Sequence, residues 1–208
     1  MKNDTDVEIE VKFYVISLPE VENKIQELGG SLVQERIFES NLRFDTGDQR
    51  LRNLRQVLRL RKDKANILTF KGAAEMGAAV SVRQEIEVLV DDFEKARRLL
   101  EGLGYEVVME YEKYRRIYSL LDTLVVLDEL PYGNFVEIEG PDGKTIQKVA
   151  RNLNLSWKAR VMTSYTYLFE ALKKLHPELE GKVLTFADLK GMRFMPDEMG
   201  VRPADLPF

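Results

Sequence analysis

The sequence predicts an α+β fold whose strands carry charged residues on one side and apolar residues on the other. Residues 7–13 read VEIEVKF, so carboxylates and an ammonium alternate with apolar side chains, and alternate residues of a strand point to opposite sides. Similar alternation returns in later segments, and stretches with helical periodicity lie between and after them. These patterns predict helices packed on the apolar side of a charged sheet.

Eight strands are expected in order along the chain, separated by turn residues such as Gly47 and Pro131. Their ranges are 7–15, 32–45, 56–62, 66–71, 80–90, 106–120, 123–130 and 135–140.

Two helices are expected between strands. The first covers 18–28, with Ser17 as N-cap and a glycine stop after it, and the second covers 91–103, with Asp91 or Asp92 as N-cap.

Further helices are expected after the last strand. Apolar periodicity predicts them over 144–153 and 160–175, and a short helix is expected over 186–189. We therefore expect one domain over residues 1–175 and a C-terminal extension over 176–208. The extension contains four of the seven prolines, and three roles are open for it: wrapping the domain, capping an opening, or forming homodimer contacts.

Composition limits the class of protein. The 208-residue chain is 44% hydrophobic, enough to bury a core. It has no cysteine and one histidine, His176, which excludes a disulfide framework, a thiolate metal site and a histidine pair. A net charge of -4 speaks against broad nucleic-acid binding. No apolar run approaches the roughly 20 residues of a membrane-spanning helix, and no signal segment is seen, so we expect a soluble, cytoplasmic protein.

The charged sides of the strands form the candidate site. Two placements explain them, and the residue pattern alone leaves both open. In one, the charged sides face water and pair across strands, each pair contributing about 0.2–1 kcal/mol. In the other, the sheet closes into a barrel whose charged sides line its interior while helices cover its apolar outside.

The chemistry of these residues fits a metal-polyphosphate site. A cationic interior needs an anionic occupant because buried, unpaired charge is costly, and arginine forks match phosphate oxygens. Glu8, Glu10, Glu137 and Glu139 offer the hard oxygen ligands that suit Mg²⁺ or Mn²⁺.

The motif Glu8-x-Glu10-x-Lys12 resembles the ExExK signature of the CYTH, or triphosphate tunnel metalloenzyme, superfamily. The resemblance continues through the later charged strands to Ser164-Tyr165 and covers roughly residues 7–172. It implies an eight-stranded antiparallel closed β-barrel, or tunnel, with a charged interior and helices packed outside. Such a tunnel binds a triphosphate and one or two divalent ions.

The resemblance also implies roles for individual residues. The implied metal ligands are Glu8, Glu10, Asp128, Glu137 and Glu139, with Glu87 contributing directly or through water. The implied phosphate-binding residues are Lys12, Arg59, Arg61, Lys71, Arg83, Lys113 and Arg115. Lys12, or a water supported by a glutamate such as Glu10, is expected to activate the nucleophile.

Arg43 departs from the family pattern, which often has an aromatic residue at this position. It adds a phosphate contact if it points inward. Arg116 is expected to face outward if Arg115 faces inward.

The expected function is hydrolysis of a triphosphate with Mg²⁺ or Mn²⁺. The expected substrate is tripolyphosphate, thiamine triphosphate or ATP. Hydrolysis is the preferred reaction because it needs only the phosphate-binding residues, and no base-reading motif is seen. Two alternatives stay open: a class IV adenylyl cyclase that converts ATP to cyclic AMP and pyrophosphate, and a non-catalytic polyphosphate-binding protein.

Overall fold

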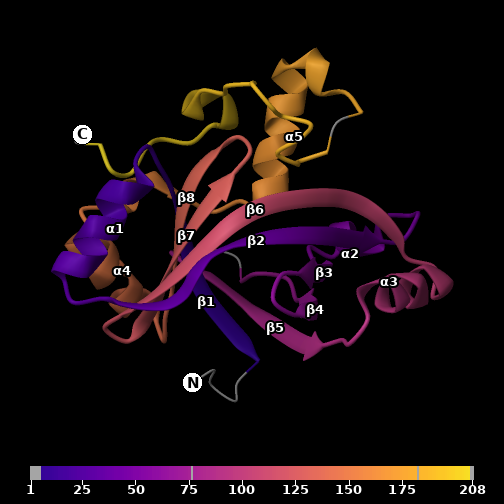
Figure 1. Ribbon diagram of the computed structural model, residues 1–208, viewed down its shortest axis with the longest axis horizontal. Helices are drawn as coiled ribbons and strands as arrows, with labels where there is room; N and C mark the ends of the chain where they lie inside the picture. Colours follow the sequence, from indigo (N-terminus) through magenta and orange to yellow (C-terminus); the bar gives the residue numbers. More distant parts are fainter. Residues whose placement is uncertain (1–5, 76, 182, 207–208) are drawn as a thin grey trace.

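A closed ring of antiparallel strands organises the structure, a computed structural model that describes residues 6–75, 77–181 and 183–206. The strands of the ring are β1 (Val7–Val15), β2 (Ser31–Asp45), β3 (Val57–Lys62), β4 (Asn66–Lys71), β5 (Ser81–Leu89), β6 (Glu106–Leu120), β7 (Thr123–Leu130) and β8 (Gly133–Glu139). They are hydrogen-bonded in the order β5-β4-β3-β2-β6-β7-β8-β1, and β1 also pairs with β5 (Figure 1). This pairing closes the ring and confirms the eight-stranded antiparallel architecture.

The ring is not a regular barrel. Its longest pair, β2 and β6, shows three register shifts, between Leu32 and Gln34, Gln34 and Ile37, and Arg43 and Phe44. Such irregularities bend a strand and increase its twist. The expected strands are all present, and no end differs from the expected one by more than two residues.

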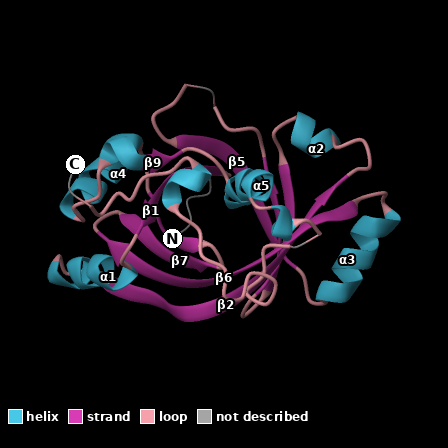
Figure 2. Cartoon of the chain, turned by 90° about the horizontal axis from the view of Figure 1, so that it is seen from above, coloured by secondary structure: helices cyan, strands magenta, loops and turns pink. Residues whose placement is uncertain are grey.

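Helices cover the outside of the ring, as Figure 2 shows from above. These are α1 (Leu18–Glu27), α2 (Arg50–Asn53), α3 (Phe93–Gly102), α4 (Gly143–Asn152) and α5 (Tyr165–Leu175). The main core forms where α1 and α4 pack on the strands, with Phe13, Ile25, Ile138 and Ile146 fully buried. A smaller core forms where Leu100 of α3 packs near Leu60.

The N-caps follow local chemistry. Ser17 accepts a hydrogen bond from the Glu20 amide at 3.3 Å, and Asp92, rather than Asp91, accepts one from the Lys95 amide at 2.9 Å. A side-chain oxygen at this position satisfies an amide that has no partner within the helix.

Two expected helices need correction. The helix expected over 160–175 begins only at Tyr165, because Arg160–Val161 instead form a two-residue strand, β9, that pairs with β1. The preceding Trp157–Ala159 form a 3-10 helix. Residues 186–189 form turns rather than a helix, since so short a segment gains few helical hydrogen bonds for the cost of nucleation. A 3-10 helix at Pro196–Met199 was not expected.

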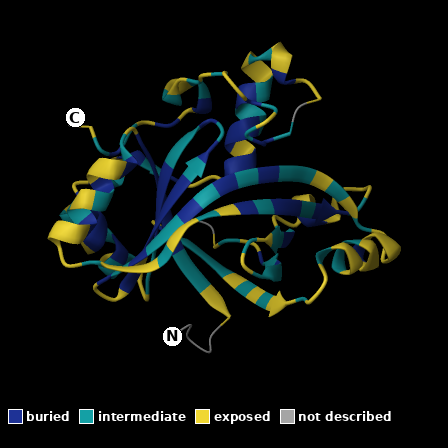
Figure 3. Cartoon of the chain, viewed as in Figure 1, coloured by how far each residue is buried: buried dark blue, intermediate teal, exposed yellow. Residues whose placement is uncertain are grey.

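The described part of the expected C-terminal extension packs against α5 and the ring. Leu179 and Leu184 are fully buried against Phe169 and Leu172 of α5 in a third core, and Figure 3 shows the inner end of α5 buried. Leu184 forms an isolated parallel β-bridge with Tyr111 of β6. The Ala204 amide donates a hydrogen bond to the Tyr14 carbonyl at 2.8 Å. Within the described residues, no helix combines the length and the apolar character needed to cross a membrane.

Asp205 ties the extension to α1, and its loss is expected to destabilise the fold. Its carboxylate accepts hydrogen bonds of 2.9 Å from the amides of Ile16 and Ser17. We predict that Asp205→Ala lowers the free energy of unfolding by about 1–3 kcal/mol, the scale of losing hydrogen bonds to a charged group, measured by urea denaturation. Asp197→Ala, an exposed site in the same extension, is the control. Equal effects of the two substitutions would contradict a stabilising role of these hydrogen bonds.

Candidate functional site

The ring encloses a charged cavity of about 270 Å³. Side chains alternate between the two sides of a strand, so β8 directs Glu137 and Glu139 into the cavity and Val136 and Ile138 into the outer core. Its cationic lining residues are Lys12, Arg43, Arg59, Arg61, Lys71, Arg83, Lys113 and Arg115. Its acidic lining residues are Glu8, Glu10, Glu85, Glu87, Glu137 and Glu139. The charged sides of the strands therefore line one interior and do not face bulk water.

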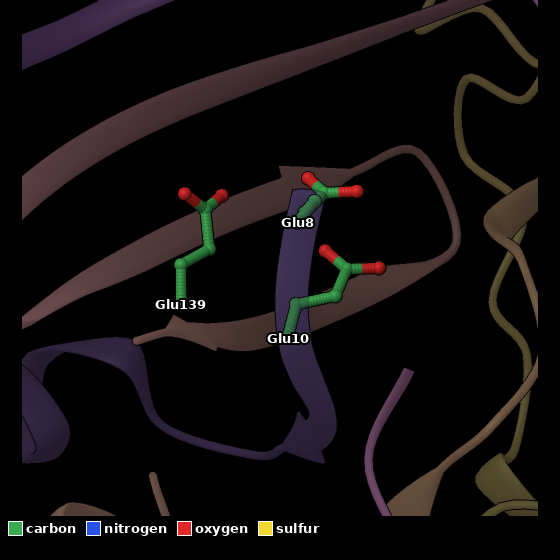
Figure 4. Close-up of side chains that lie close together, drawn as sticks. All are labelled: Glu8, Glu10 and Glu139. Carbon is green, nitrogen blue, oxygen red and sulfur yellow. The ribbon is translucent and has the colours of Figure 1, made fainter. Parts of the chain in front are cut away.

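Three glutamates form an acidic triad in this cavity. Glu8 and Glu10 lie two residues apart on β1, and Glu139 is the β8 partner of Glu10 (Figure 4). One carboxylate oxygen from each residue lies within 4.8 Å of the others. Three hard oxygen donors this close together fit a divalent ion such as Mg²⁺ or Mn²⁺.

The electrostatics of the triad also fit a cation. Burial, and then the neighbouring Glu8 carboxylate, raise the pKa of Glu139 to about 7. Burial likewise raises the pKa of Glu8, although Lys71 opposes this shift. The ionised forms of Glu8 and Glu139 are thus disfavoured by their surroundings, and a bound cation would relieve this.

Asp128, expected among the metal ligands, lies apart from the triad. It is 0% exposed and behind the lining of the cavity. Its carboxylate accepts hydrogen bonds from Arg115 at 2.6 and 2.7 Å, from Lys113 at 3.0 Å and from the Tyr165 hydroxyl at 2.9 Å. These donors occupy its oxygens, so its observed role is to hold cations in place.

Glu137 lines the cavity but is also engaged by cations. It lies 2.8 Å from the Lys12 ammonium and 2.5 Å from the Arg115 guanidinium. Burial would raise the pKa of Glu137, but Lys12 and Arg115 hold it well below its usual value.

Glu39 is a buried partner that the sequence reasoning missed. It is 1% exposed on β2 and lies 3.6 Å from Lys113, 3.8 Å from Arg61 and 3.9 Å from Arg115. Burial would raise its pKa, but these cations lower it to about 2. Alternation with Phe38 and Ser40 along β2 was a signal for its inward orientation.

Two tyrosines complete the walls. The Tyr165 ring, in the first turn of α5, lies 4.6 Å from the Lys12 ammonium and 5.5 Å from that of Lys113, distances typical of cation–π contacts. Tyr111 lines the cavity on β6. Burial raises the pKa of Tyr111, but Arg59 and Lys113 lower it overall.

The two arginines singled out by sequence have opposite orientations. Arg43 points inward and lines the cavity, where it donates a hydrogen bond to Thr166. Arg116 lies outside the cavity and pairs with Glu22 of α1, as expected.

A model of the CYTH domain matches residues 6–163, and the chain therefore belongs to the CYTH domain family. The match contains the strands of the ring and the acidic triad. Ser164, Tyr165 and Thr166 lie just beyond its end.

Relatives share the fold over most of the chain. The "Putative adenylate cyclase MJ0240" of Methanocaldococcus jannaschii is 29% identical over 135 residues, which are 64% of this chain and 76% of that protein. A solved "putative adenylate cyclase" of Vibrio parahaemolyticus has a TM-score of 0.71 at 22% identity, covering 80% of this chain and 99% of the other. The structure of "Putative adenylyl cyclase HpAC1" of Hippeastrum, described as revealing a dominant triphosphatase activity, has a TM-score of 0.61 at 17% identity, covering 79% and 95%.

The role of Asp128 can be tested by stability. We predict that Asp128→Ala lowers the free energy of unfolding by about 3–5 kcal/mol, because it leaves buried cations unpaired, while Mn²⁺ affinity of the folded protein stays within about threefold of wild type. Urea denaturation and calorimetric titration measure the two quantities. Glu129→Ala removes only the surface pair with Arg36 and should cost no more than about 1 kcal/mol. A large loss of Mn²⁺ affinity in Asp128→Ala would return this residue to the metal site.

The triad can be tested by metal binding. We predict that Glu10→Gln and Glu139→Gln each weaken Mn²⁺ binding at least about tenfold, because each removes one charged ligand. In EDTA at pH 8, Glu139→Gln should have a Tm no lower than wild type, since burial disfavours the ionised carboxylate that it replaces. Glu27→Gln, exposed on α1, is the control for calorimetry. Unchanged Mn²⁺ affinity in both triad variants would place the metal elsewhere.

Proposed function

We propose that this protein is a divalent-metal-dependent triphosphatase that hydrolyses a short inorganic or organic triphosphate inside the charged tunnel. The observation that carries the proposal is one cavity lined both by eight cationic side chains and by the acidic triad. Phosphoryl transfer needs positive charge around a phosphate chain and a metal beside it, and this cavity brings both together.

The cationic residues bind and orient the phosphate chain in this proposal. Arg59, Arg61, Lys71, Arg83, Lys113 and Arg115 come from strands on several sides of the ring, so they surround a ligand rather than contact one side of it. Arginine guanidiniums among them offer bidentate geometry for phosphate oxygens. Their existing carboxylate partners hold the side chains in the cavity before the ligand arrives.

Lys12 is proposed to stabilise charge on the phosphate chain. Its ammonium lies 2.8 Å from Glu137 and 3.9 Å from Glu10, and these carboxylates outweigh burial and raise its pKa. A lysine held in its charged form is suited to neutralise developing negative charge and is poorly suited to accept a proton. Of the two routes considered for activating the nucleophile, this geometry favours a glutamate-supported water.

Glu8, Glu10 and Glu139 are proposed to hold Mg²⁺ or Mn²⁺, which when bound supplies Lewis-acid polarisation of the phosphoryl group. A metal held there would lie beside Lys71 and Arg83, since Glu8 lies 2.6 Å from Lys71 and Glu10 lies 3.8 Å from Arg83. A carboxylate of the triad would orient water toward the phosphorus atom.

A class IV adenylyl cyclase is the second candidate. The names of the Methanocaldococcus jannaschii and Vibrio parahaemolyticus relatives favour it. The Hippeastrum protein carries a cyclase name, yet its structure is described as revealing dominant triphosphatase activity, which supports hydrolysis as the first choice. In either case, residues 1–175 are proposed as the catalytic domain, and residues 176–208 as an extension that packs against α5. The protein is proposed to be cytoplasmic and to have no nucleic-acid partner.

Turnover with defined substrates tests the proposal. With Mg²⁺ or Mn²⁺, wild-type protein should release phosphate from tripolyphosphate, thiamine triphosphate or ATP. Glu10→Gln should lower kcat/KM by about 10²–10³-fold, the scale of losing one electrostatic stabiliser of a transition state. The same variant should still bind tripolyphosphate in EDTA, because the cations remain.

Three outcomes separate the candidates. Cyclic AMP and pyrophosphate as the main products from ATP would replace hydrolysis by cyclisation. Ligand binding without turnover in either metal would indicate a non-catalytic polyphosphate-binding protein. Full activity of Glu10→Gln, with Glu27→Gln as the matched control, would remove the triad from the mechanism.

A further inference from the structure

Arg43 differs from the other cations of the tunnel in having no acidic partner. Lys12, Arg59, Arg61, Lys71, Arg83, Lys113 and Arg115 each lie within 4.0 Å of a carboxylate oxygen. Across residues 6–75, 77–181 and 183–206, the structure shows no carboxylate within this distance of the Arg43 guanidinium. The nearby Asp45 is already engaged, since it accepts hydrogen bonds from the amides of Thr46, Leu51 and Arg52.

The surroundings of Arg43 increase this imbalance. Burial lowers its pKa, Tyr111 and Asp45 partly offset the shift, and the neighbouring positive charges of Arg59 and Arg83 lower the pKa further. A largely buried guanidinium without an ion-pair partner in direct contact is costly. An anionic ligand bound beside Arg43 would supply an opposite charge and offset this free-energy cost.

Arg43 lies on the side of the ring opposite Glu8 and Glu10. β2, which carries Arg43, lies four strands from β1 in either direction around the ring. It therefore approaches the cavity from the side opposite Glu8 and Glu10. A phosphate chain held by a metal on the triad would meet Arg43 across the tunnel.

Two hydroxyl groups at the start of α5 lie next to Arg43, one bonded to its guanidinium and the other to the first hydroxyl. Arg43 donates a hydrogen bond to the Thr166 hydroxyl, which lies 3.0 Å from that of Ser164, and both residues line the cavity. Ser164 caps the eleven-residue helix α5, whose first amides lack partners within the helix and favour an anion.

We propose that Arg43, together with the hydroxyls of Thr166 and Ser164, forms a phosphoryl-binding corner opposite the acidic triad. This corner binds the non-bridging oxygens of one phosphoryl group in a polyphosphate chain. The inference rests on the tunnel of the proposed function as a phosphate-binding site, but it requires no turnover.

Calorimetric titration of the metal-free protein with tripolyphosphate in EDTA tests the corner. Arg43→Gln should weaken binding about 10- to 100-fold, the loss expected for a charge-assisted hydrogen bond, and Thr166→Val should weaken it about 2- to 10-fold, as for a neutral one. Arg43→Lys should restore part of the lost affinity, since it keeps the charge without the fork. Arg36→Gln is the matched control, because Arg36 lies on the same strand but is exposed and pairs with Glu129.

Thermal unfolding without ligand distinguishes binding from a structural role. Because no carboxylate of the described residues lies within 4.0 Å of the Arg43 guanidinium, Arg43→Gln should have a Tm equal to or above that of wild type, whereas an arginine that holds the fold together would lower the Tm when replaced. A Tm of Arg43→Gln below that of wild type, together with unchanged affinity for tripolyphosphate, would indicate a structural arginine and overturn the corner. So would binding of tripolyphosphate by Arg43→Gln within twofold of wild type while Arg59→Gln is weakened.

The outcomes also separate this inference from the proposed function. If wild-type protein binds tripolyphosphate through Arg43 but never hydrolyses it, the triphosphatase proposal fails and the corner stands. If hydrolysis proceeds and Arg43→Gln binds like wild type, the corner fails and the triphosphatase stands. Absence of tripolyphosphate binding by wild-type protein would overturn both.

Discussion

Pairing of buried charge is the constraint on which this structure depends. The ring turns its charged sides inward, and an ionised group taken out of water must meet an opposite charge or hydrogen-bond partners. The deepest part of the tunnel meets this condition with Glu39 and Asp128, which hold Lys113 and Arg115 from two sides. Toward the triad the pairing is less complete, since burial and acidic neighbours raise the pKa of Glu139. Among the described residues of the tunnel, Glu139 and Arg43 have no opposite charge within 4.0 Å, and both lie where ligands are proposed to bind.

An inward-facing charged sheet places its apolar side on the outside, so the rest of the chain has to cover it. The helices α1 and α4 bury that side with Ile25 and Ile146. α5 serves two purposes: its first turn contributes Tyr165 to the tunnel, and its later turns pack on the C-terminal extension through Phe169 and Leu172. The extension is therefore connected to the tunnel by one continuous core, and it supports the position of Tyr165 and, through the Tyr165 hydroxyl, Asp128.

Local sequence predicts most of the ring because period-two alternation fixes which side of a strand is charged. It locates Glu10, Arg59 and Glu137 in one interior once the ring is known to close, but closure itself depends on pairing between β1 and β5, which no local pattern states. The hydrogen-bond partners of Asp128 could not be predicted for the same reason: Lys113 and Tyr165 lie 15 and 37 residues away. Glu39 was overlooked because β2 contains register shifts and polar residues on both sides, which obscure its alternation. The expected start of the last helix at Arg160 was wrong, because pairing of β9 with β1 overrides helical periodicity there.

The internal ion pairs also link the two proposed ligands. Lys71 lies 2.6 Å from Glu8, and Arg83 lies 3.8 Å from Glu10, so two cations proposed to bind phosphate are held by carboxylates proposed to bind metal. A divalent ion on the triad would compete for these carboxylates and weaken their hold on Lys71 and Arg83, while Glu85 would still pair with Lys71 at 3.3 Å. By thermodynamic reciprocity, a phosphate chain that engaged the two cations would strengthen metal binding by the same factor. The ion pairs of the tunnel would thus favour joint binding of metal and triphosphate over binding of either alone.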